Sequence, residues 1–189
     1  MALQDNAVIL PGTGHVLIAP VGTTAPASPA DVDPEANPPA DGWENLGHTS
    51  RENSVTMTRE GDEPETRGSW QNANLRVTTP TVQWGLTISA LQIDNTVLSL
   101  YFGGGDASQP DSFGVTTGFG STEKAMYLLL VDGPNRAGLY LPRVSISADE
   151  PPTFDPQNFL EFTLRVSILK ASGIPDLMRW FRAGLGTAA

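Results

Sequence analysis

Strict alternation of apolar and polar side chains is the feature that most limits how this chain can fold. It runs through two long segments, 81–90 and 159–171, in which aliphatic and aromatic residues share one face and polar residues with few charges share the other. A period of two with β-branched and aromatic residues is typical of half-buried strands. Further strands are predicted at 15–21, 55–59, 124–132 and 138–148, so the fold is expected to be mainly β.

The order of these segments predicts an antiparallel β-sandwich or barrel that forms a single domain over 1–189. The segment 124–132 has a continuous apolar centre, which indicates a strand buried on both faces. The polar faces of the long strands are built from Thr, Ser and Gln, whereas a face that meets only solvent usually carries more Lys and Glu. Such faces suit subunit contacts or the wall of a wide aqueous lumen.

One helix is predicted to flank the strands over about 94–102. Asp94 is a good N-cap and Gly103 a good stop, with Val97, Leu98 and Tyr101 between them. A second, short helix is predicted over about 176–183, within a C-terminal extension at 172–189. Its apolar stripe would be Leu177, Trp180 and Phe181, and at this length it must dock on another element.

The segment 22–42 is rich in proline and acid and has no base or aromatic residue. Because it has only Val32 to bury, it is not expected to offset its ordering entropy alone. Two interpretations stay open: a solvated flexible loop, or an arm that orders on a neighbouring subunit, as a shorter N-terminal arm at 1–14 could also do. The candidate inter-subunit arm residues are Pro26, Pro29, Asp31, Asp33, Pro34, Glu35, Pro38 and Pro39.

Negative charge is concentrated in the first third of the chain. The net charge is -10, of which residues 1–65 carry -9 (eleven acids, two bases) and residues 66–189 carry -1 (ten acids, nine bases). A pI near 4.4 argues against holding duplex DNA through its phosphates. Asp62, Glu63 and Glu65 are candidate lumen or loop acids.

Residues that could carry catalysis or hold a metal are scarce. There is no Cys and there are two His, which excludes disulfides, thiol nucleophiles and most zinc sites. Asp31, Asp33 and Glu35 lack the Gly and Glu that a calcium-binding EF-hand loop needs. No Gly-x-Ser-x-Gly elbow or phosphate-binding loop in the right context is present. We therefore expect no enzyme activity, cofactor or metal, and the longest apolar run is too short to span a membrane.

Three dispersed tryptophans, Trp43, Trp70 and Trp180, are candidate interface anchors, because large aromatic side chains are enriched at the centres of protein interfaces.

The order of several short motifs resembles that of the major tail tube proteins of long, non-contractile-tailed bacteriophages. A short apolar strand runs into an Ala-Pro-x-Gly-Thr-x-x-Pro turn at 19–26. The sequence 43–50 (WENLGHTS) then resembles the Trp-x-x-Leu-Gly-x-Thr/Ser strand and turn of that family. The helix ends in Tyr101-Phe102-Gly103, and the last long strands follow in the family's order. The resemblance covers about residues 8–171.

This resemblance implies a structural protein of the virion tail, made in the host cytoplasm. Subunits of the family form hexameric rings that stack into a tube, and double-stranded DNA passes through without specific binding. The implied fold is a β-sandwich-like barrel with one flanking helix, whose loops and N-terminal arm reach adjacent rings. The implied partners are other copies of the chain, the tape measure protein, the tail terminator and the distal tail proteins.

Two alternatives stay open on the sequence. One is an adhesive or receptor-binding β-sandwich on a virion or cell surface, in which scattered Trp and acidic loops would bind sugar or calcium. The other is the tube protein of a contractile injection or secretion machine, which shares the ring-stacking fold. Self-assembly separates a tube protein from an adhesin.

Overall fold

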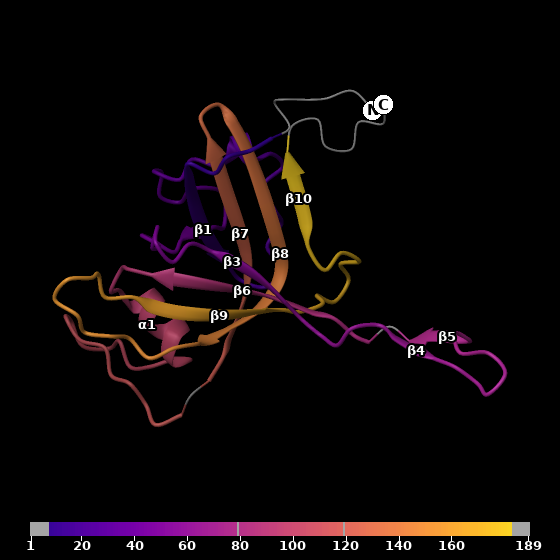
Figure 1. Cartoon of the computed structure of the whole chain (residues 1–189). Coiled ribbons are helices and arrows are strands. Elements are labelled where there is room, and N and C mark those ends of the chain that lie inside the picture. The colour runs from indigo at the N-terminus through magenta and orange to yellow at the C-terminus, as the bar shows by residue number, and fades with distance from the viewer. Residues whose placement is uncertain (1–7, 79, 119, 183–189) are drawn as a thin grey trace.

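The computed structural model describes residues 8–78, 80–118 and 120–182, and it confirms a mainly β chain with antiparallel pairing (Figure 1). One α-helix, α1 (Asn95–Phe102), and one short 3-10 helix, η2 (Pro29–Asp31), lie in this described part. The strands are β1 (Thr13–Ala19), β2 (Glu44–Asn45), β3 (Thr56–Glu60), β4 (Glu65–Arg67), β5 (Arg76–Thr78), β6 (Gln83–Ala90), β7 (Thr122–Asp132), β8 (Asn135–Ala148), β9 (Phe162–Ile168) and β10 (Arg179–Arg182).

Most strands form one sheet in the order β2-β1-β7-β8-β9-β6-β3, and β10 adds to β8. The long strand β8 pairs with β10 through Ala137–Tyr140 and with β9 through Val144–Ala148. Between these stretches the register against β7 shifts, and Pro142, which has no N–H to donate, lies at the irregularity. Figure 1 shows the consequence: the β1–β7–β8 part stands upright and crosses the β9–β6–β3 part.

The chain buries two apolar clusters on opposite faces of β1 and β7. Val16 and Ile18 belong to the larger cluster, while Leu17 and Ala19 belong to the smaller one. This double burial confirms the prediction drawn from the continuous apolar centre of β7. In β6 and β9, by contrast, only alternate residues enter the larger cluster, as half-buried strands require.

Helix α1 begins and ends where the sequence predicts. The Asp94 carboxylate accepts a hydrogen bond from Val97 N (2.8 Å), and Gly103 takes the left-handed conformation with φ of 73° that closes the last turn. Its buried residues Val97, Leu100 and Tyr101 pack against β8 and β9. The helix therefore covers one face of the sheet, as expected.

The predicted helix over 176–183 is wrong. Residues Arg179–Arg182 form strand β10, which pairs with Ala137–Tyr140, and position 183 lies outside the described residues. Leu177 and Met178 are partly buried just before it. A segment this short is a marginal helix, whereas the open side of β8 offers its backbone a ladder of hydrogen bonds. The strand predicted at 159–171 is likewise shorter, Phe162–Ile168, since its pairing begins with Phe162 opposite Ala90 and ends with Ile168 opposite Val144.

The three tyrosines predict a loss of stability at alkaline pH. Burial raises the pKa of Tyr101 and Tyr140, and burial with the nearby Asp31 carboxylate raises that of Tyr127 to about 12. In the unfolded chain these phenols ionise near pH 10. Between about pH 10 and 12 the folded chain therefore binds more protons, and the free energy of unfolding is expected to fall as pH rises.

Ultraviolet absorbance of tyrosinate, recorded beside circular dichroism, checks this expectation. Phenol ionisation should lag behind pH 10 and finish only as the fold is lost. Three phenols that titrate near pH 10 in a chain that stays folded would contradict it.

Candidate assembly surfaces

A broad polar surface with few charges covers four neighbouring strands, and we call it the polar face. The register aligns Ser145, Ser167, Gly85 and Thr58 in one row across β8, β9, β6 and β3. The next row brings Ser147, Arg165, Thr87 and Thr56 together. The full set is Thr56, Thr58, Glu60, Gln83, Gly85, Thr87, Ser89, Ser145, Ser147, Thr163, Arg165 and Ser167.

The two charges on the polar face largely offset each other. Arg165 pairs with Glu60 (3.8 Å) and with Asp149 (2.9 Å), so its guanidinium lies between two carboxylates. The remaining side chains are small hydroxyls or an amide. The sheet thus gathers onto one surface the polar faces that the alternation predicts, on the side opposite the larger apolar cluster.

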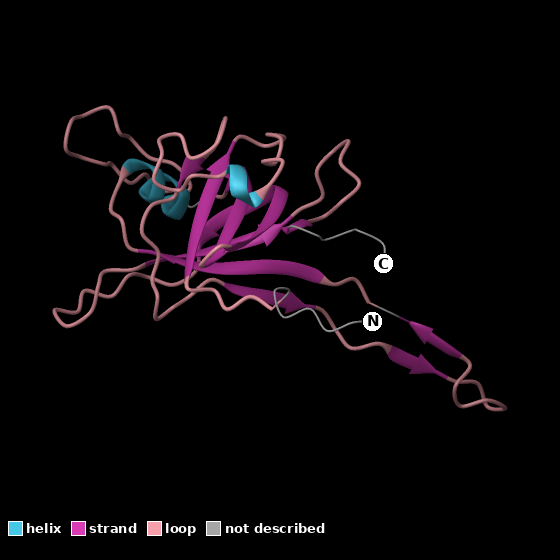
Figure 2. Ribbon diagram, turned by 90° about the horizontal axis from the view of Figure 1, so that it is seen from above, coloured by secondary structure: helices cyan, strands magenta, loops and turns pink. Residues whose placement is uncertain are grey.

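A second surface, the hairpin, was not anticipated from the sequence. Strands β4 and β5 pair through Thr66 and Val77 and extend beyond the end of the β3–β6 ladder, away from the body of the molecule (Figures 1 and 2). Neither strand joins the main sheet. Each has three residues, too few for an alternation to be recognised. The sequence signals that could have marked the hairpin are Gly61 and Pro80, which interrupt the adjoining strands on either side of it.

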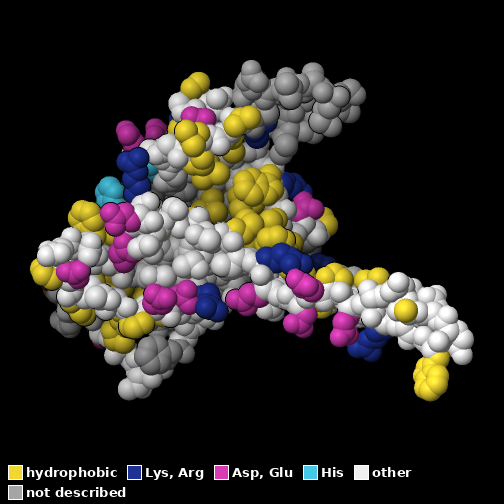
Figure 3. Space-filling view, in the orientation of Figure 1, with side chains coloured by type: hydrophobic (Ala, Val, Ile, Leu, Met, Phe, Trp, Pro, Cys, Tyr) yellow, Lys and Arg dark blue, Asp and Glu magenta, His cyan; other side chains and the backbone are white. Residues whose placement is uncertain are grey.

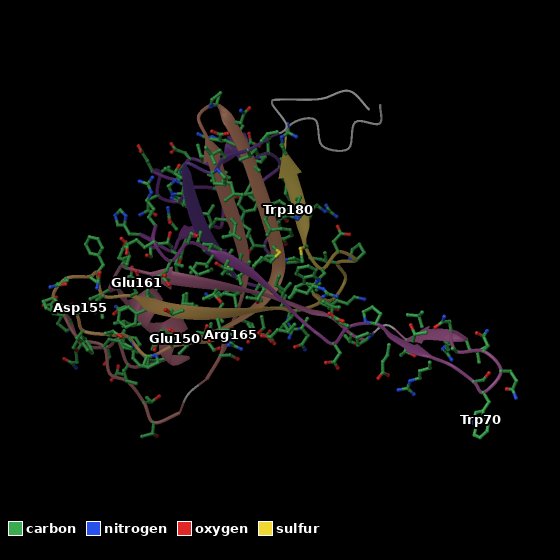
Figure 4. The ribbon with its side chains drawn as sticks, viewed as in Figure 1. Trp70, Glu150, Asp155, Glu161, Arg165 and Trp180 are labelled. Atoms are coloured by element: carbon green, nitrogen blue, oxygen red, sulfur yellow. The ribbon has the colours of Figure 1, made fainter. Side chains whose placement is uncertain are left out.

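Acids lie at the root of the hairpin and an indole lies at its tip. Asp62, Glu63 and Glu65 are all exposed, and Glu65 pairs with Arg67 (3.2 Å). Their role as lumen acids stays a prediction. Figure 4 shows Trp70 at the far end of the hairpin, where its side chain is fully exposed.

The structure corrects the view that segment 22–42 has little to bury on its own subunit. Pro29, Val32 and Pro39 are buried, and the ends of the segment lie against β1, β7 and β8. Side chains elsewhere in the subunit donate hydrogen bonds to four main-chain carbonyls of the segment: Trp43 Nε1 to Thr24 O (3.1 Å), Tyr140 Oη to Thr23 O (2.8 Å), Arg136 Nη1 to Val32 O (2.7 Å) and Asn45 Nδ2 to Pro34 O (3.1 Å).

The other side chains of the segment face outward to different degrees. Asp31, Asp33, Glu35 and Pro38 are exposed, and Pro26 and Pro34 are half-buried. These side chains are accessible to a neighbouring subunit even though the segment is hydrogen-bonded to its own subunit. That contact stays a prediction, as does any contact of residues 8–14, of which Leu10 is 78% exposed; residues 1–7 and 183–189 lie outside the described part.

The three candidate tryptophan anchors separate into one core residue and two surface residues. Trp43 is 1% exposed and cannot anchor an interface: it makes edge contacts with Tyr127 and Tyr140 and donates to Thr24. Trp180, on β10, is 48% exposed and lies within an apolar patch visible near the centre of Figure 3. Trp70 and Trp180 therefore stay candidates.

An open groove of about 1240 Å³ lies between the loop 49–54 and the loop 149–161, over the end of the polar face. We call it the acidic groove, because its lining has one base, Arg51, and five acids: Glu52, Asp149, Glu150, Asp155 and Glu161. Burial raises the pKa of Glu161, but hydrogen bonds from Ser50, Asn53 and Ser89 outweigh it and hold that pKa below its ordinary value. Glu161 thereby fastens loop 49–54 to the sheet as a carboxylate.

No part of the described chain gathers three or more His, Asp or Glu side chains in a way that could hold a metal ion. Over the same residues, no helix is both long enough and apolar enough to cross a membrane.

Comparison with known proteins identifies the family of the chain. The family of phage tail tube proteins matches residues 1–189. The chain is 35% identical to the major tail protein Gp23 of Mycobacterium phage D29 over 157 residues, which cover 79% of this chain and 78% of the relative. It is 36% identical to the major tail protein Gp23 of Mycobacterium phage L5 over the same shares. The chain belongs to the phage tail tube protein family, and is thus a structural component of the virion tail and not an enzyme.

Proposed function

We propose that copies of this chain close into hexameric rings, that the rings stack into the tail tube, and that the polar face lines the lumen through which double-stranded DNA is ejected. The observation that carries the proposal is the polar face itself: four strands of hydroxyl and amide side chains, whose cation Arg165 is held between Glu60 and Asp149. Duplex DNA binds proteins chiefly through Lys and Arg at its phosphates. A wall without free cations lets it slide.

The sheet edges support ring closure. Within the described chain, β3 and β10 each pair with a single strand, which leaves one side of each open. Open edges are a template for pairing with another chain, and closing a ring removes them. The exposed Trp180 on β10 adds apolar area at that edge. The tape measure protein, the tail terminator and the distal tail proteins are proposed as further partners, at the inside and the two ends of the tube.

Electron microscopy of the purified chain over a range of salt and protein concentrations tests the assembly. We expect tubes whose averaged rings have sixfold symmetry. Small monodisperse particles under every condition would overturn the tube, and rings of another symmetry would overturn the hexamer.

Lysines placed on the polar face test the lumen. In Thr58→Lys/Thr87→Lys/Ser167→Lys tubes, each ring of six would gain 18 cations facing the DNA, since three substitutions occur in each of about six copies. These tubes are expected to retain duplex DNA at a salt concentration that releases it from parent tubes, with a steeper dependence on salt.

The matched control, Gln109→Lys/Thr116→Lys/Thr117→Lys, adds the same charge to an exposed loop away from this face. Fluorescent duplex retained inside purified tubes is the readout. Equal retention by the two triple variants would contradict a lumen at the polar face while leaving tube assembly intact.

A further inference from the structure

The tip of the hairpin, residues 66–77, has the composition of a docking element. Trp70 is fully exposed, and Leu75 (62%) and Val77 (58%) are also largely open to solvent. The hairpin projects away from the body and shares no sheet with it, so no described part of its own subunit covers these side chains (Figures 1 and 4). Exposed aromatic residues with apolar neighbours are typical of interface anchors.

Charge narrows the choice of partner. The tip contains Arg67 and Arg76, opposite each other across the β4–β5 ladder, and no acid, so its formal charge is +2. Arg67 also pairs with Glu65 just outside the tip, but this ion pair is exposed and such pairs contribute little stability, so both guanidinium groups can meet another partner. The rest of the chain is strongly acidic, with a total of -10. A basic, apolar tip on an acidic protein is complementary to an acidic surface of a second copy.

The acidic groove supplies such a surface. Its lining carries five acids against Arg51, and of the five, Asp149 is the one that forms an ion pair within the described part of the chain. Glu52 and Glu150 are exposed and unpaired there. Phe159, 81% exposed, offers an apolar surface in the same groove. A groove of about 1240 Å³ is large enough for an indole with its flanking residues.

The tip and the groove lie at opposite ends of one pair of strands. Thr56 and Thr87 pair at the groove end of the β3–β6 ladder, and Glu60 and Gln83 pair at the end from which the hairpin leaves. Figure 4 shows Trp70 on one side of the molecule and Glu150, Asp155 and Glu161 on the other. A tip therefore cannot reach its own groove. Two complementary surfaces at opposite ends of a subunit join copies head to tail.

We propose that the hairpin tip of one copy binds in the acidic groove of the next copy, with Trp70 against Phe159, and with Arg67 and Arg76 facing Glu52 and Glu150. Each copy then offers one tip and one groove, and the contact repeats along the direction of β3 and β6. This inference rests on the proposed function, because it names the surface that receives the hairpin when rings stack.

A charge exchange tests the contact. Arg67→Glu/Arg76→Glu and Glu52→Arg/Glu150→Arg should each raise the critical concentration for tube assembly at least tenfold, which is about the effect of losing one hot-spot interaction. The chain that carries all four substitutions should return to within about threefold of the parent, because the charges are complementary again. Trp70→Ala should raise the critical concentration by a similar factor without restoration by the groove variant.

Glu44→Arg/Asp106→Arg is the matched control, since both acids are exposed and lie outside the groove and outside segment 22–42. Sedimentation measures assembly, and circular dichroism shows that each variant is folded. Tip variants that assemble like the parent, or a four-substitution chain no better than its two halves, would overturn the proposed contact while tubes still form.

Cross-linking tests the same contact without requiring tubes. The chain has no native Cys, so Gln71→Cys at the tip and Thr153→Cys in the groove can be introduced into separate copies. A mixture should form disulfide-linked dimers at least tenfold faster than Gln71→Cys mixed with Thr116→Cys. Equal rates would overturn the contact whether or not the parent forms tubes.

Discussion

Trp43→Ala is expected to lower the free energy of unfolding of the isolated subunit by about 3–5 kcal/mol, the range for removing a large aromatic side chain from a core. The indole is 1% exposed and contacts the rings of Tyr127 and Tyr140. Its loss also leaves the Thr24 carbonyl without the Nε1 donor. The segment 22–42 would then lose part of the surface on which it packs, so the damage should extend beyond the cavity.

Urea unfolding of unassembled subunits measures this loss, and Trp70→Ala is the matched control. The same substitution at a fully exposed tryptophan should change the free energy of unfolding by about 0.5 kcal/mol or less. The two variants should also separate by phenotype: Trp43→Ala weakens folding, whereas Trp70→Ala weakens assembly of a stable subunit. A Trp43→Ala subunit as stable as Trp70→Ala would contradict the burial of this indole.

Gly138→Ala is expected to cost at least about 1–3 kcal/mol, the usual range for overpacking a core, although it adds only one methyl group. A Cβ at position 138 would overlap the hydroxyl and ring of Tyr127, because the Tyr127 side chain occupies the space that a side chain at position 138 of β8 would need. Tyr127 cannot easily move, because it is fully buried and in contact with Trp43 and Phe181.

Gly14→Ala is the control for this prediction. Gly14 is also in a strand of the main sheet, but a Cβ there meets Leu129 O at 3.6 Å, an ordinary contact. That variant should be neutral or more stable by up to about 1 kcal/mol, since alanine restricts the unfolded chain more than glycine does. Thermal unfolding of both variants is the measurement, and a drop in Tm confined to Gly14→Ala would refute the steric account.

Local patterns predicted the parts of the fold that local physics controls. The alternation in β6 and β9 and the continuous apolar run in β7 depend on which faces are buried, and side-chain sequence encodes this directly. The caps of α1 at Asp94 and Gly103 are likewise local. These features predicted a mainly β chain with one flanking helix.

The predictions that were wrong concern residues whose structure depends on contacts with parts of the chain distant in sequence. Residues Arg179–Arg182 become a strand because β8 has a free side, a fact about residues some forty positions earlier in the chain. Trp43 is core and not interface because Tyr127 and Tyr140 approach it from β7 and β8. The hairpin and the acidic groove were missed because they join short segments whose composition resembles any polar loop.

The hydrogen bonds that hold segment 22–42 on its subunit do not depend on the segment's own side chains. The donors belong to the body of the protein, at Trp43, Asn45, Arg136 and Tyr140, and they bind main-chain carbonyls, which every residue type supplies. The outward side chains Asp31, Asp33, Glu35 and Pro38 can therefore diverge between phages while the attachment is kept. In engineering terms, the segment is a display site that is already fastened at several points, suited to carrying a foreign peptide on each subunit.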